Sequence, residues 1–306
     1  MAETGLGLSP ERLAPLRCPT CRAGTLAAGG SQEALVCSAC GAQHLAQEGV
    51  AFLVADAGAH GDAIEKARSV NPLWYQDEQP AELVSPWRHH MRKRRLYVQG
   101  VIRAELARRG LSRVPRLLDM GCGDGNHLRW LSDFAEATYG SDYNPVRLAR
   151  ARAQLPDATL FMADILDFPA FDRSFDVIFF NHVIEHIPQD VKALETAKRL
   201  LAPGGLLILG TPNEGAWWWQ LAYRRDPESL RTTDHVHFYT AGLLRERMQS
   251  AGLRVEHIHH MGWGPPDWRL DGRIRKYKLV DDGFEWIGRL FLKGQASSLY
   301  ALARAD

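Results

Sequence analysis

The sequence lacks a long apolar run and lacks an excess of charge of either sign. None of its apolar stretches approaches the ~18–20 residues that a membrane-spanning helix needs. Lys and Arg number 37 and Asp and Glu number 36, so the formal net charge is only +1. No global field therefore favours nucleic acid, an anionic membrane or an acidic substrate, and any basic site must be local. We expect no membrane partner.

The start of the chain also lacks the signature of export. Met1-Ala2-Glu3 is acidic and no apolar signal region follows it, so we expect a cytoplasmic protein. At ~100–200 residues a domain, the 306 residues leave room for a catalytic domain and a small module. The 45% apolar share is ordinary for a packed chain and excludes collagen-like, disordered and coiled-coil classes.

Cysteine is scarce, but four of the five cysteines form two Cys-x-x-Cys pairs. They are Cys18, Cys21, Cys37 and Cys40. Two such pairs are typical of a structural zinc site, in which four soft thiolates close a tetrahedral sphere and leave no open position for water. Two disulfides are the alternative, which a reducing cytosol disfavours. A redox-active pair would need to begin a helix, whereas Arg22-Ala23-Gly24 follows Cys21.

Residues 16–54 resemble the small zinc-ribbon modules related to the Trm112 family. The resemblance rests on Leu16-Arg17-Cys18-Pro19-Thr20-Cys21, on the run from Leu35 to His44, and on Glu48-Gly49-Val50-Ala51-Phe52-Leu53-Val54. Those modules pair two knuckles on a short β-hairpin and close with a strand that has proline where this chain has Ala51. The resemblance implies a zinc-ribbon module over residues 1–56 that binds structural Zn2+.

Residues 57–110 are predicted to form a linker and an N-terminal helical cap. Glycines and Pro72 lie among small and polar residues in the linker. The basic run at residues 88–95 then passes into apolar residues at helical spacing, which predicts a long amphipathic helix ending at Gly110.

From Arg116 onward, short apolar runs alternate with helical patterns. The runs are Leu117-Leu118, Ala137-Thr138-Tyr139, Thr159-Leu160-Phe161, Val177-Ile178-Phe179-Phe180 and Leu206-Leu207-Ile208-Leu209. This alternation predicts an α/β fold with a doubly wound, mostly parallel sheet over residues 111–306.

The first run leads into a glycine-rich turn, Asp119-Met120-Gly121-Cys122-Gly123-Asp124-Gly125-Asn126. Glycines let the backbone approach a ligand closely, and the start of the following helix offers free N–H groups. The dinucleotide fingerprint needs its third glycine three residues after the second, but Gly125 follows Gly123 by two. The turn therefore disfavours NAD.

The turn resembles the Asp-x-Gly-x-Gly-x-Gly motif of the class I S-adenosylmethionine-dependent methyltransferases, and later landmarks follow in that family's order. The resemblance implies a seven-stranded Rossmann-like sheet whose last strand is Ser297–Leu302, and S-adenosyl-L-methionine as cofactor. It implies these cofactor-binding positions: Asp119, Gly121, Gly123, Gly125, Asp142, Tyr143, Asp164, Ile165, Asn181 and His182.

Two of these positions have a specific implied role. Asp142 would accept hydrogen bonds from both ribose hydroxyls, because the two oxygens of one carboxylate suit the two donors of a diol. Asp164 would bind the adenine amino group, with an apolar neighbour on the ring. Taken alone, Asp142 is also compatible with a helix N-terminal acid and Asp164 with a solvated loop acid.

Methyl transfer from a sulfonium is an in-line displacement that requires no metal, but an oxygen acceptor needs a base, for which histidine is best tuned at neutral pH. The candidate catalytic residues are His235, His237 and His186. The segment from Asp234 to Tyr239 resembles a "DHxHF(F/Y)T" segment of small-molecule O-methyltransferases. His186 and His237 are equally compatible with purely structural hydrogen bonds.

Two insertions, near residues 212–240 and 262–295, are predicted lids. The first contains Trp217-Trp218-Trp219, which cannot all face one way on a helix, so at least one is expected to meet solvent, a ligand or a partner. Aromatic walls suit an apolar or ring-bearing acceptor.

The sequence thus predicts methylation of a small-molecule acceptor, with oxygen favoured over nitrogen and carbon. An rRNA or tRNA methyltransferase is the alternative, because a zinc ribbon and a basic helix resemble certain ribosomal-RNA guanine methyltransferases. Against it, Asn181-His182-Val183-Ile184 stands where the Asn-Pro-Pro-Tyr signature is expected. A non-catalytic adaptor that binds S-adenosylmethionine and docks a partner through the ribbon is a third hypothesis. A homo-oligomer is left open.

Overall fold

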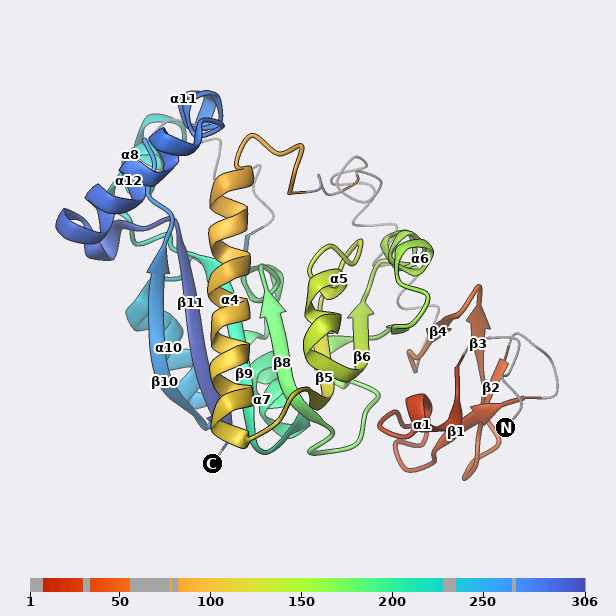
Figure 1. Cartoon of the computed structure of the whole chain (residues 1–306). Helices are drawn as coiled ribbons and strands as arrows, with labels where there is room; N and C mark the ends of the chain where they lie inside the picture. Colours follow the sequence, from red (N-terminus) through yellow and green to blue (C-terminus); the bar gives the residue numbers. More distant parts are fainter. Residues whose placement is uncertain are drawn as a thin grey trace. The chain divides into compact units, whose positions relative to one another are not determined.

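The computed structural model describes residues 8–29, 34–55, 78, 82–227, 235–265 and 268–305. The chain divides into two compact units, each described here by itself. The first comprises residues 1–79, 111–179 and 199–205, and the second comprises residues 80–110, 180–198 and 206–306. Figure 1 shows the elements of both units.

The first unit begins with α1 (Pro10–Leu13) and a set of short antiparallel strands. These are β1 (Leu26–Ala28), β2 (Ala34–Cys37), β3 (Gln43–Gln47) and β4 (Val50–Phe52). Leu26 on β1 pairs with Cys37 on β2. This pairing places Cys37 beside the turn that contains Cys18 and Cys21, and the sulfur of Cys37 lies 3.5 Å from that of Cys21. Glu48 and Gly49 have φ of 51° and 75° and connect β3 to β4 as a two-residue hairpin turn, for which left-handed residues are required.

Strand β4 continues into the sheet of the same unit. It pairs antiparallel with β3 and parallel with β7 (Thr159–Met162), and Ala51 is opposite Ala46 on one side and Phe161 on the other. A proline here would remove a ladder hydrogen bond from an internal strand, which gives a physical reason for alanine at this position. The predicted boundary at residue 56 and the linker that follows lie largely outside the described residues.

The rest of the first unit is a parallel sheet. Its strands β5 (Val114–Met120), β6 (Ala135–Asp142), β7 and β8 (Phe175–Asn181) are ordered β7-β6-β5-β8. All seven residues of β8 are buried, as expected for a strand covered on both faces. The connections contain α5 (Leu128–Leu131), η1 (Ser132–Phe134), α6 (Pro145–Gln154) and η2 (Ile165–Asp167).

The second unit contains an antiparallel sheet in the order β9-β11-β10. Its strands are β9 (Leu201–Pro212), β10 (Leu253–Met261) and β11 (Ser298–Ala305). Its helices are α4 (Arg88–Arg109), η3 (Ile184–His186), α7 (Asp190–Leu200), α8 (Trp217–Arg225), α10 (Ala241–Ser250), α11 (Trp268–Ile274), α12 (Lys278–Phe291) and η4 (Lys293–Gln295). The mostly parallel sheet of the first unit, with helices in its connections, confirms the predicted α/β class.

Helix α4 ends as predicted, because Gly110 is left-handed with φ of 65° and its N–H donates to Ala107. The helix runs along β11 and β10 (Figure 1), and Tyr97 stacks on His259 with ring centroids 4.4 Å apart. Near its C-terminal end, the buried Glu105 accepts from the guanidinium groups of Arg304 at 2.8 Å and Arg108 at 2.7 Å.

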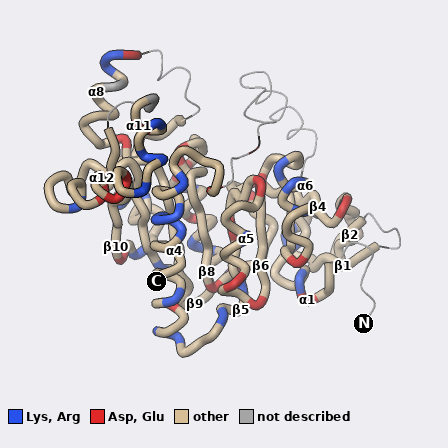
Figure 2. The backbone as a smooth tube through the Cα atoms, turned by 45° about the horizontal axis from the view of Figure 1, so that its top comes forward, with Lys and Arg blue, Asp and Glu red and all other residues tan. Residues whose placement is uncertain are grey.

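The basic run at the start of α4 is used inside the second unit. Arg88 donates to the Lys276 carbonyl at 2.8 Å, and Arg95 donates to Glu82 at 2.8 Å. Lysine and arginine are interleaved with aspartate and glutamate along the described chain (Figure 2). These internal contacts weigh against an RNA-binding face on this helix.

The Glu105 ion pairs predict an acid-dependent stability. Burial acts to raise the pKa of Glu105, but the hydrogen bonds from Arg108 and Arg304 outweigh it and lower that pKa to about 2 from 4.5. The group therefore stabilises the folded state fully above pH 4.5, and this contribution disappears as pH falls toward 2. Glu105→Gln is expected to lower the free energy of unfolding at pH 7 by about 3 kcal/mol, because Arg304 and Arg108 lose the buried carboxylate that they share, although Arg304 keeps its contact with Glu256.

Urea unfolding at pH 7 and at pH 3 measures this effect. The variant should lose less stability than the wild type between the two pH values. The exposed Glu195→Gln serves as the matched control and should behave as the wild type at both. Equal acid sensitivity of wild type and Glu105→Gln would exclude a stabilising role for the pair.

Candidate functional site

The glycine turn of the first unit lies at the carboxyl ends of β5, β6 and β7. Gly121, Gly123 and Gly125 all have positive φ, between 54° and 83°. A Cβ at Gly125 would lie 2.7 Å from a methyl group of Leu155, so close packing as well as conformation requires glycine there. The residues predicted to bind a cofactor on these strands are thus gathered at one edge of the sheet, where open α/β sheets bind ligands.

Asp142 ends β6 and is held by the turn. The N–H of Gly123 donates to its Oδ2 at 2.8 Å, and the N–H of Asn144 donates to its Oδ1 at 2.8 Å. Burial raises the pKa of Asp142, although these two hydrogen bonds act to lower it. Each carboxylate oxygen has a second lone pair, so both can still accept from a ligand. Tyr143, next in the chain, is half-buried.

Asp119 is the most perturbed acid of this site. It is 1% exposed at the end of β5, and its Oδ2 has no hydrogen-bond partner. Burial and the charge of Asp142 raise its pKa to about 8. A buried carboxyl group without a partner fits a site in which a ligand supplies the missing donor or positive charge.

Asp164 and Ile165 follow β7, whose Met162 pairs with Asp142. The Asp164 side chain accepts from the N–H of Leu166 at 2.8 Å and caps η2, and Ile165 is half-buried. The carboxylate is therefore oriented by its own loop. Between β5 and the helix, the thiol of Cys122 is buried, and burial raises its pKa, which is the opposite of an activated nucleophile.

In the second unit, the buried Glu185 connects the residues that follow β8. It is 1% exposed, its Oε1 lies 3.3 Å from Nδ1 of His182, and its Oε2 accepts from the Thr211 hydroxyl at 3.1 Å. Burial acts to raise the pKa of Glu185, but the hydrogen bond and charge of His182 lower it overall. Its backbone carbonyl also accepts from the N–H groups of Val236 and His237, at 2.8 and 3.1 Å.

Asn181 and His182 lie four and three residues before this glutamate. Oδ1 of Asn181 is buried without a hydrogen-bond partner, and a Cβ at Gly210 would lie 2.1 Å from it. His182 has a left-handed φ of 53°, which is uncommon for a residue with a Cβ. Its Nε2 lies 2.9 Å from Nη2 of Arg94, and burial together with the charge of Arg94 lowers its pKa. The sequence does not identify Glu185 and Arg94 as site residues, because both contact His182 only in the folded chain.

The three candidate base residues have different surroundings. Nδ1 of His235 lies 3.2 Å from Oε1 of Glu214, which is 2% exposed. His186 is edge-on to His235, with ring centroids 5.0 Å apart. Nε2 of His237 lies 3.2 Å from the carbonyl oxygen of Pro188, a geometry that requires a proton on that nitrogen.

The sequence did not reveal Glu214, because its partners come from elsewhere in the chain. Tyr223 on α8 donates to its Oε2 at 2.5 Å, and burial, together with this hydrogen bond, raises the pKa of that phenol. A carboxylate three residues before a run of tryptophans carried no spacing signal. Its burial beside a histidine, visible only after folding, marks it as part of the site.

Aromatic side chains surround this glutamate. Trp219 stacks on Tyr223 with centroids 5.7 Å apart, and Tyr223 meets Phe238 edge-on at 6.0 Å. Trp217 is 53% exposed whereas Trp218 is 9% exposed, which confirms that the three tryptophans do not face one way. Residues 228–234 of the predicted lid, including Asp234, lie outside the described residues.

The acid Glu185 and the histidines His186 and His235 also form a cluster whose ligand atoms lie within 4.8 Å of one another. Such a set could accept a metal ion, which the histidine spacing in the sequence had not indicated.

The four paired cysteines converge as the sequence predicted. Their sulfur atoms all lie within 4.8 Å of one another, with Cys18 and Cys40 3.8 Å apart and Cys21 and Cys37 3.5 Å apart. Four sulfurs at ~2.3 Å from a tetrahedral zinc ion lie ~3.8 Å from each other, so the arrangement fits the ion. All five cysteines are described and all are free thiols, so the disulfide alternative finds no support.

Two further features suit a thiolate centre. Backbone N–H groups of Ala23 and Gly24 lower the pKa of Cys21 to about 6. Nε2 of His44, a buried residue not assigned from the sequence, lies 3.3 Å from the sulfur of Cys18.

The curated proteins to which this chain is similar include several methyltransferases. A probable S-adenosylmethionine-dependent methyltransferase of Mycolicibacterium smegmatis is 28% identical over 162 residues, which cover 52% of this chain and 61% of that protein. The ubiquinone biosynthesis O-methyltransferase of Cereibacter sphaeroides is 28% identical over 194 residues, which cover 59% of this chain and 78% of that protein. The chain thus spans less than two thirds of the first relative's length.

A solved structure from Galdieria sulphuraria, assigned as a sarcosine dimethylglycine methyltransferase, shares the fold. It has a TM-score of 0.52 and 18% identity, and covers 80% of this chain and 99% of that one. Residues 87–258, more than half of the sequence, match the family described as a methyltransferase domain. The chain therefore belongs to this family, among the class I S-adenosylmethionine-dependent methyltransferases.

Proposed function

We propose that the protein transfers a methyl group from S-adenosyl-L-methionine to an oxygen atom of a small molecule, with His235 as the base. The observation that carries the proposal is the gathering of Asp119, Asp142 and Asp164 around the glycine turn at one sheet edge. When bound, the cofactor would supply a methyl group on a sulfonium sulfur, and this sulfur would become a neutral thioether when the methyl group passes to the acceptor oxygen.

The residues of the first unit would hold the nucleoside part. Asp142 is held by the turn and has lone pairs left for both ribose hydroxyls, and Asp164 would accept from the adenine amino group with Ile165 against the ring. Gly121, Gly123 and Gly125 allow the backbone to approach closely. The unpartnered oxygen of Asp119 is an acceptor suited to a cationic amino group.

His235 is the preferred base of the three histidines. Its Nδ1 faces the buried Glu214 carboxylate, which would fix the ring orientation and stabilise the imidazolium formed when Nε2 takes the acceptor proton. His237 is directed at a backbone carbonyl and is better suited to a structural role. His186 packs against His235 and would position it. The aromatic group of Trp219, Tyr223 and Phe238 suits an apolar, ring-bearing acceptor.

The two alternatives are weaker. The contacts of the basic run within the second unit disfavour RNA as the substrate. The hypothesis of a non-catalytic adaptor gives no role to the Glu214–His235 pair. The zinc ion would hold the ribbon together without taking part in the chemistry, because four thiolates complete its sphere.

Replacement of Asp142 tests the cofactor site. Asp142→Ala is expected to weaken binding of S-adenosylhomocysteine at least about 100-fold, because the ribose loses its paired acceptor and the glycine turn loses its anchor. Isothermal titration calorimetry with the purified protein measures the affinity, and circular dichroism checks the fold. The exposed Asp157→Ala is the matched control and should bind as the wild type does. Unchanged affinity of Asp142→Ala refutes the ribose assignment.

Replacement of His235 tests the base. His235→Asn is expected to lower kcat by about 10²–10⁴ on a phenolic acceptor found by screening, with the S-adenosylhomocysteine affinity kept. Glu214→Gln should also lower kcat, because the imidazole of His235 loses the carboxylate that orients it. His237→Asn is the comparison.

If His235→Asn keeps the wild-type rate while His186→Asn or His237→Asn loses it, the base is reassigned. If the rate disappears on EDTA treatment and returns with a divalent ion, the cluster of Glu185, His186 and His235 acts through a metal instead.

The ribbon is tested by its metal content. We expect about one zinc ion per chain and a lower melting temperature after chelation, because metal binding is coupled to folding in such modules. Cys37→Ser should reduce the zinc content, whereas Cys122→Ser, outside the cluster, should leave it unchanged. Metal analysis by mass spectrometry and thermal unfolding provide the two readouts. A metal-free protein of equal stability contradicts the proposed site.

A further inference from the structure

Helix α12 turns its charged face to the protein and its apolar face outward. Asp281, Glu285 and Gly288 are buried, whereas large apolar side chains of the same helix are exposed. These are Leu279 at 84%, Phe291 at 73%, Trp286 at 63%, Leu290 at 51% and Ile287 at 45%. At 3.6 residues per turn the five lie within ~140° of arc, a continuous stripe. A surface helix normally directs such a stripe at the core.

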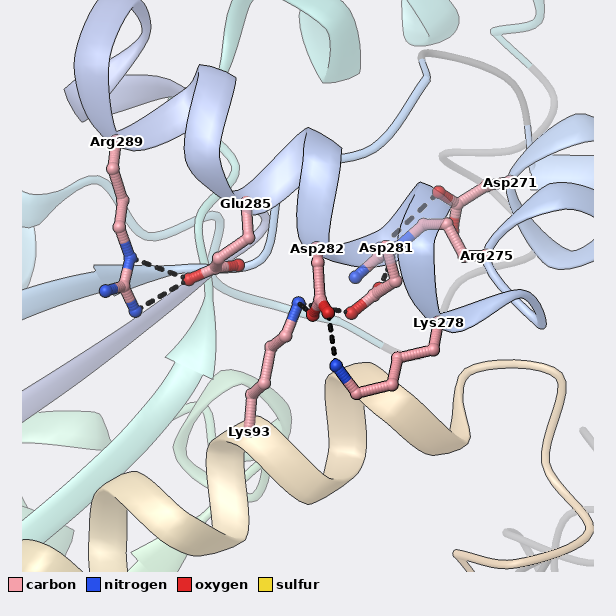
Figure 3. A network of polar contacts seen from close by, with 8 residues as sticks. All are labelled: Lys93, Asp271, Arg275, Lys278, Asp281, Asp282, Glu285 and Arg289. Carbon is pink, nitrogen blue, oxygen red and sulfur yellow. Dashed lines mark hydrogen bonds and ion pairs between the residues drawn. The ribbon is translucent and has the colours of Figure 1, made fainter.

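The charged face is fixed in place by ion pairs. Nζ of Lys93 on α4 lies 2.6 Å from Asp281 and 2.9 Å from Asp282, and Nε of Arg275 lies 2.7 Å from Asp281 (Figure 3). Arg275 and Asp281 are almost fully buried, so turning the apolar stripe inward would leave charges buried without partners. The outward orientation is therefore enforced by the structure.

Close packing gives the same orientation. A Cβ at Gly288 would lie 2.0 Å from the indole of Trp263, whose Nε1 donates to the carbonyl of Leu292 at 2.8 Å. The helix thus rests on Trp263 through its glycine, on the side opposite Leu279 and Leu290.

The exposed charges around the stripe are mostly cations. They are Arg273, Lys276, Lys278, Arg289 and Lys293. Lys278 pairs with Asp282 and Arg289 pairs with Glu285, so the excess positive charge comes from Arg273, Lys276 and Lys293. The acids of the described residues in the same stretch are occupied: Asp271 is buried against Trp87 and Arg275, Asp281 and Glu285 are buried in ion pairs, and Asp282 pairs with Lys93 and Lys278. An approaching surface therefore meets apolar side chains with a positive margin.

We propose that α12 docks the protein onto the surface of an anionic phospholipid bilayer, lying in the interface with its apolar stripe among the headgroups. Trp, Phe and Leu on one face with Lys and Arg beside them are the features of an interfacial helix, and the cations match a negative leaflet. With 14 residues α12 is too short to span, and no helix among the described residues is long and apolar enough to cross a bilayer. The sequence predicts no membrane partner, because the net charge of the whole chain is near zero. A net charge of the whole chain does not reveal a local stripe of apolar residues with cations beside it.

Vesicle co-sedimentation of the full-length protein tests this proposal. We expect binding to vesicles of phosphatidylcholine with phosphatidylglycerol, and weaker binding to phosphatidylcholine alone. The double variant Trp286→Ser/Phe291→Ser should bind at least about tenfold more weakly, because the removed side chains are the largest in the stripe. Lys276→Gln/Lys293→Gln should remove much of the preference for phosphatidylglycerol. Vesicle binding by this variant should also depend less on the salt concentration.

Leu45→Ser, which changes a 48%-exposed leucine on β3, is the matched control and should bind as the wild type does. All replaced side chains are exposed, and circular dichroism and thermal unfolding check that each variant is folded. Vesicle binding needs no methyl transfer, so the result is independent of the proposed activity.

Absence of wild-type binding to both vesicle types overturns the proposal, as does equal binding by the double variant. Light scattering gives the remaining distinction. A wild-type dimer that the double variant converts to a monomer, without vesicle binding by either, assigns the stripe to a second copy of the chain and also overturns it.

Discussion

The hydrogen bond from the Gly123 amide to the Asp142 carboxylate, 2.8 Å long, is the interaction on which the first unit's site depends. It joins the turn after β5 to the end of β6, and it is possible only because the residues of the turn have left-handed backbone conformations that glycine adopts without strain. The same arrangement brings Asp119 close enough for the charge of Asp142 to raise its pKa. A turn that positions two buried carboxyl groups costs stability, which is characteristic of a binding site rather than of a structural element.

A buried carboxylate has a comparable role in the second unit. Glu185 contacts His182 and Thr211 through its side chain and holds the segment of Val236 and His237 through its carbonyl. The histidines that follow β8 and those at residues 235–237 are therefore brought together by one residue. His235 then meets the Glu214 carboxylate, His237 meets the carbonyl oxygen of Pro188, and His186 packs edge-on against His235. These different surroundings distinguish three side chains that are equivalent in the sequence.

The positions of the charged residues on α4 and α12 decide which surfaces are exposed, and neither the composition nor the basic run in the sequence indicates them. The basic run of α4 meets Glu82, Asp281 and Asp282, so a segment that looked like a nucleic-acid surface is an internal clamp. Asp281 and Asp282 of α12 face Lys93 of α4, and Asp281 also pairs with Arg275. The apolar residues on the opposite side of α12 are therefore left exposed. The charged face of an amphipathic helix can lie against the protein only where residues of opposite charge face it. Lys93 and Arg275 provide these charges for α12.

The sequence by itself determined the α/β class, the strand runs, the end of α4 at Gly110, the cysteine pairs and the glycine turn, because each follows from local spacing, backbone preference or ligand chemistry. It could not identify Glu214, Glu185, Arg94 or His44, since their roles come from partners distant in the chain. It also gave no direction to the stripe of α12. Only the tertiary structure decided these points, because burial and pairing between distant segments set the protonation, orientation and exposure of a side chain.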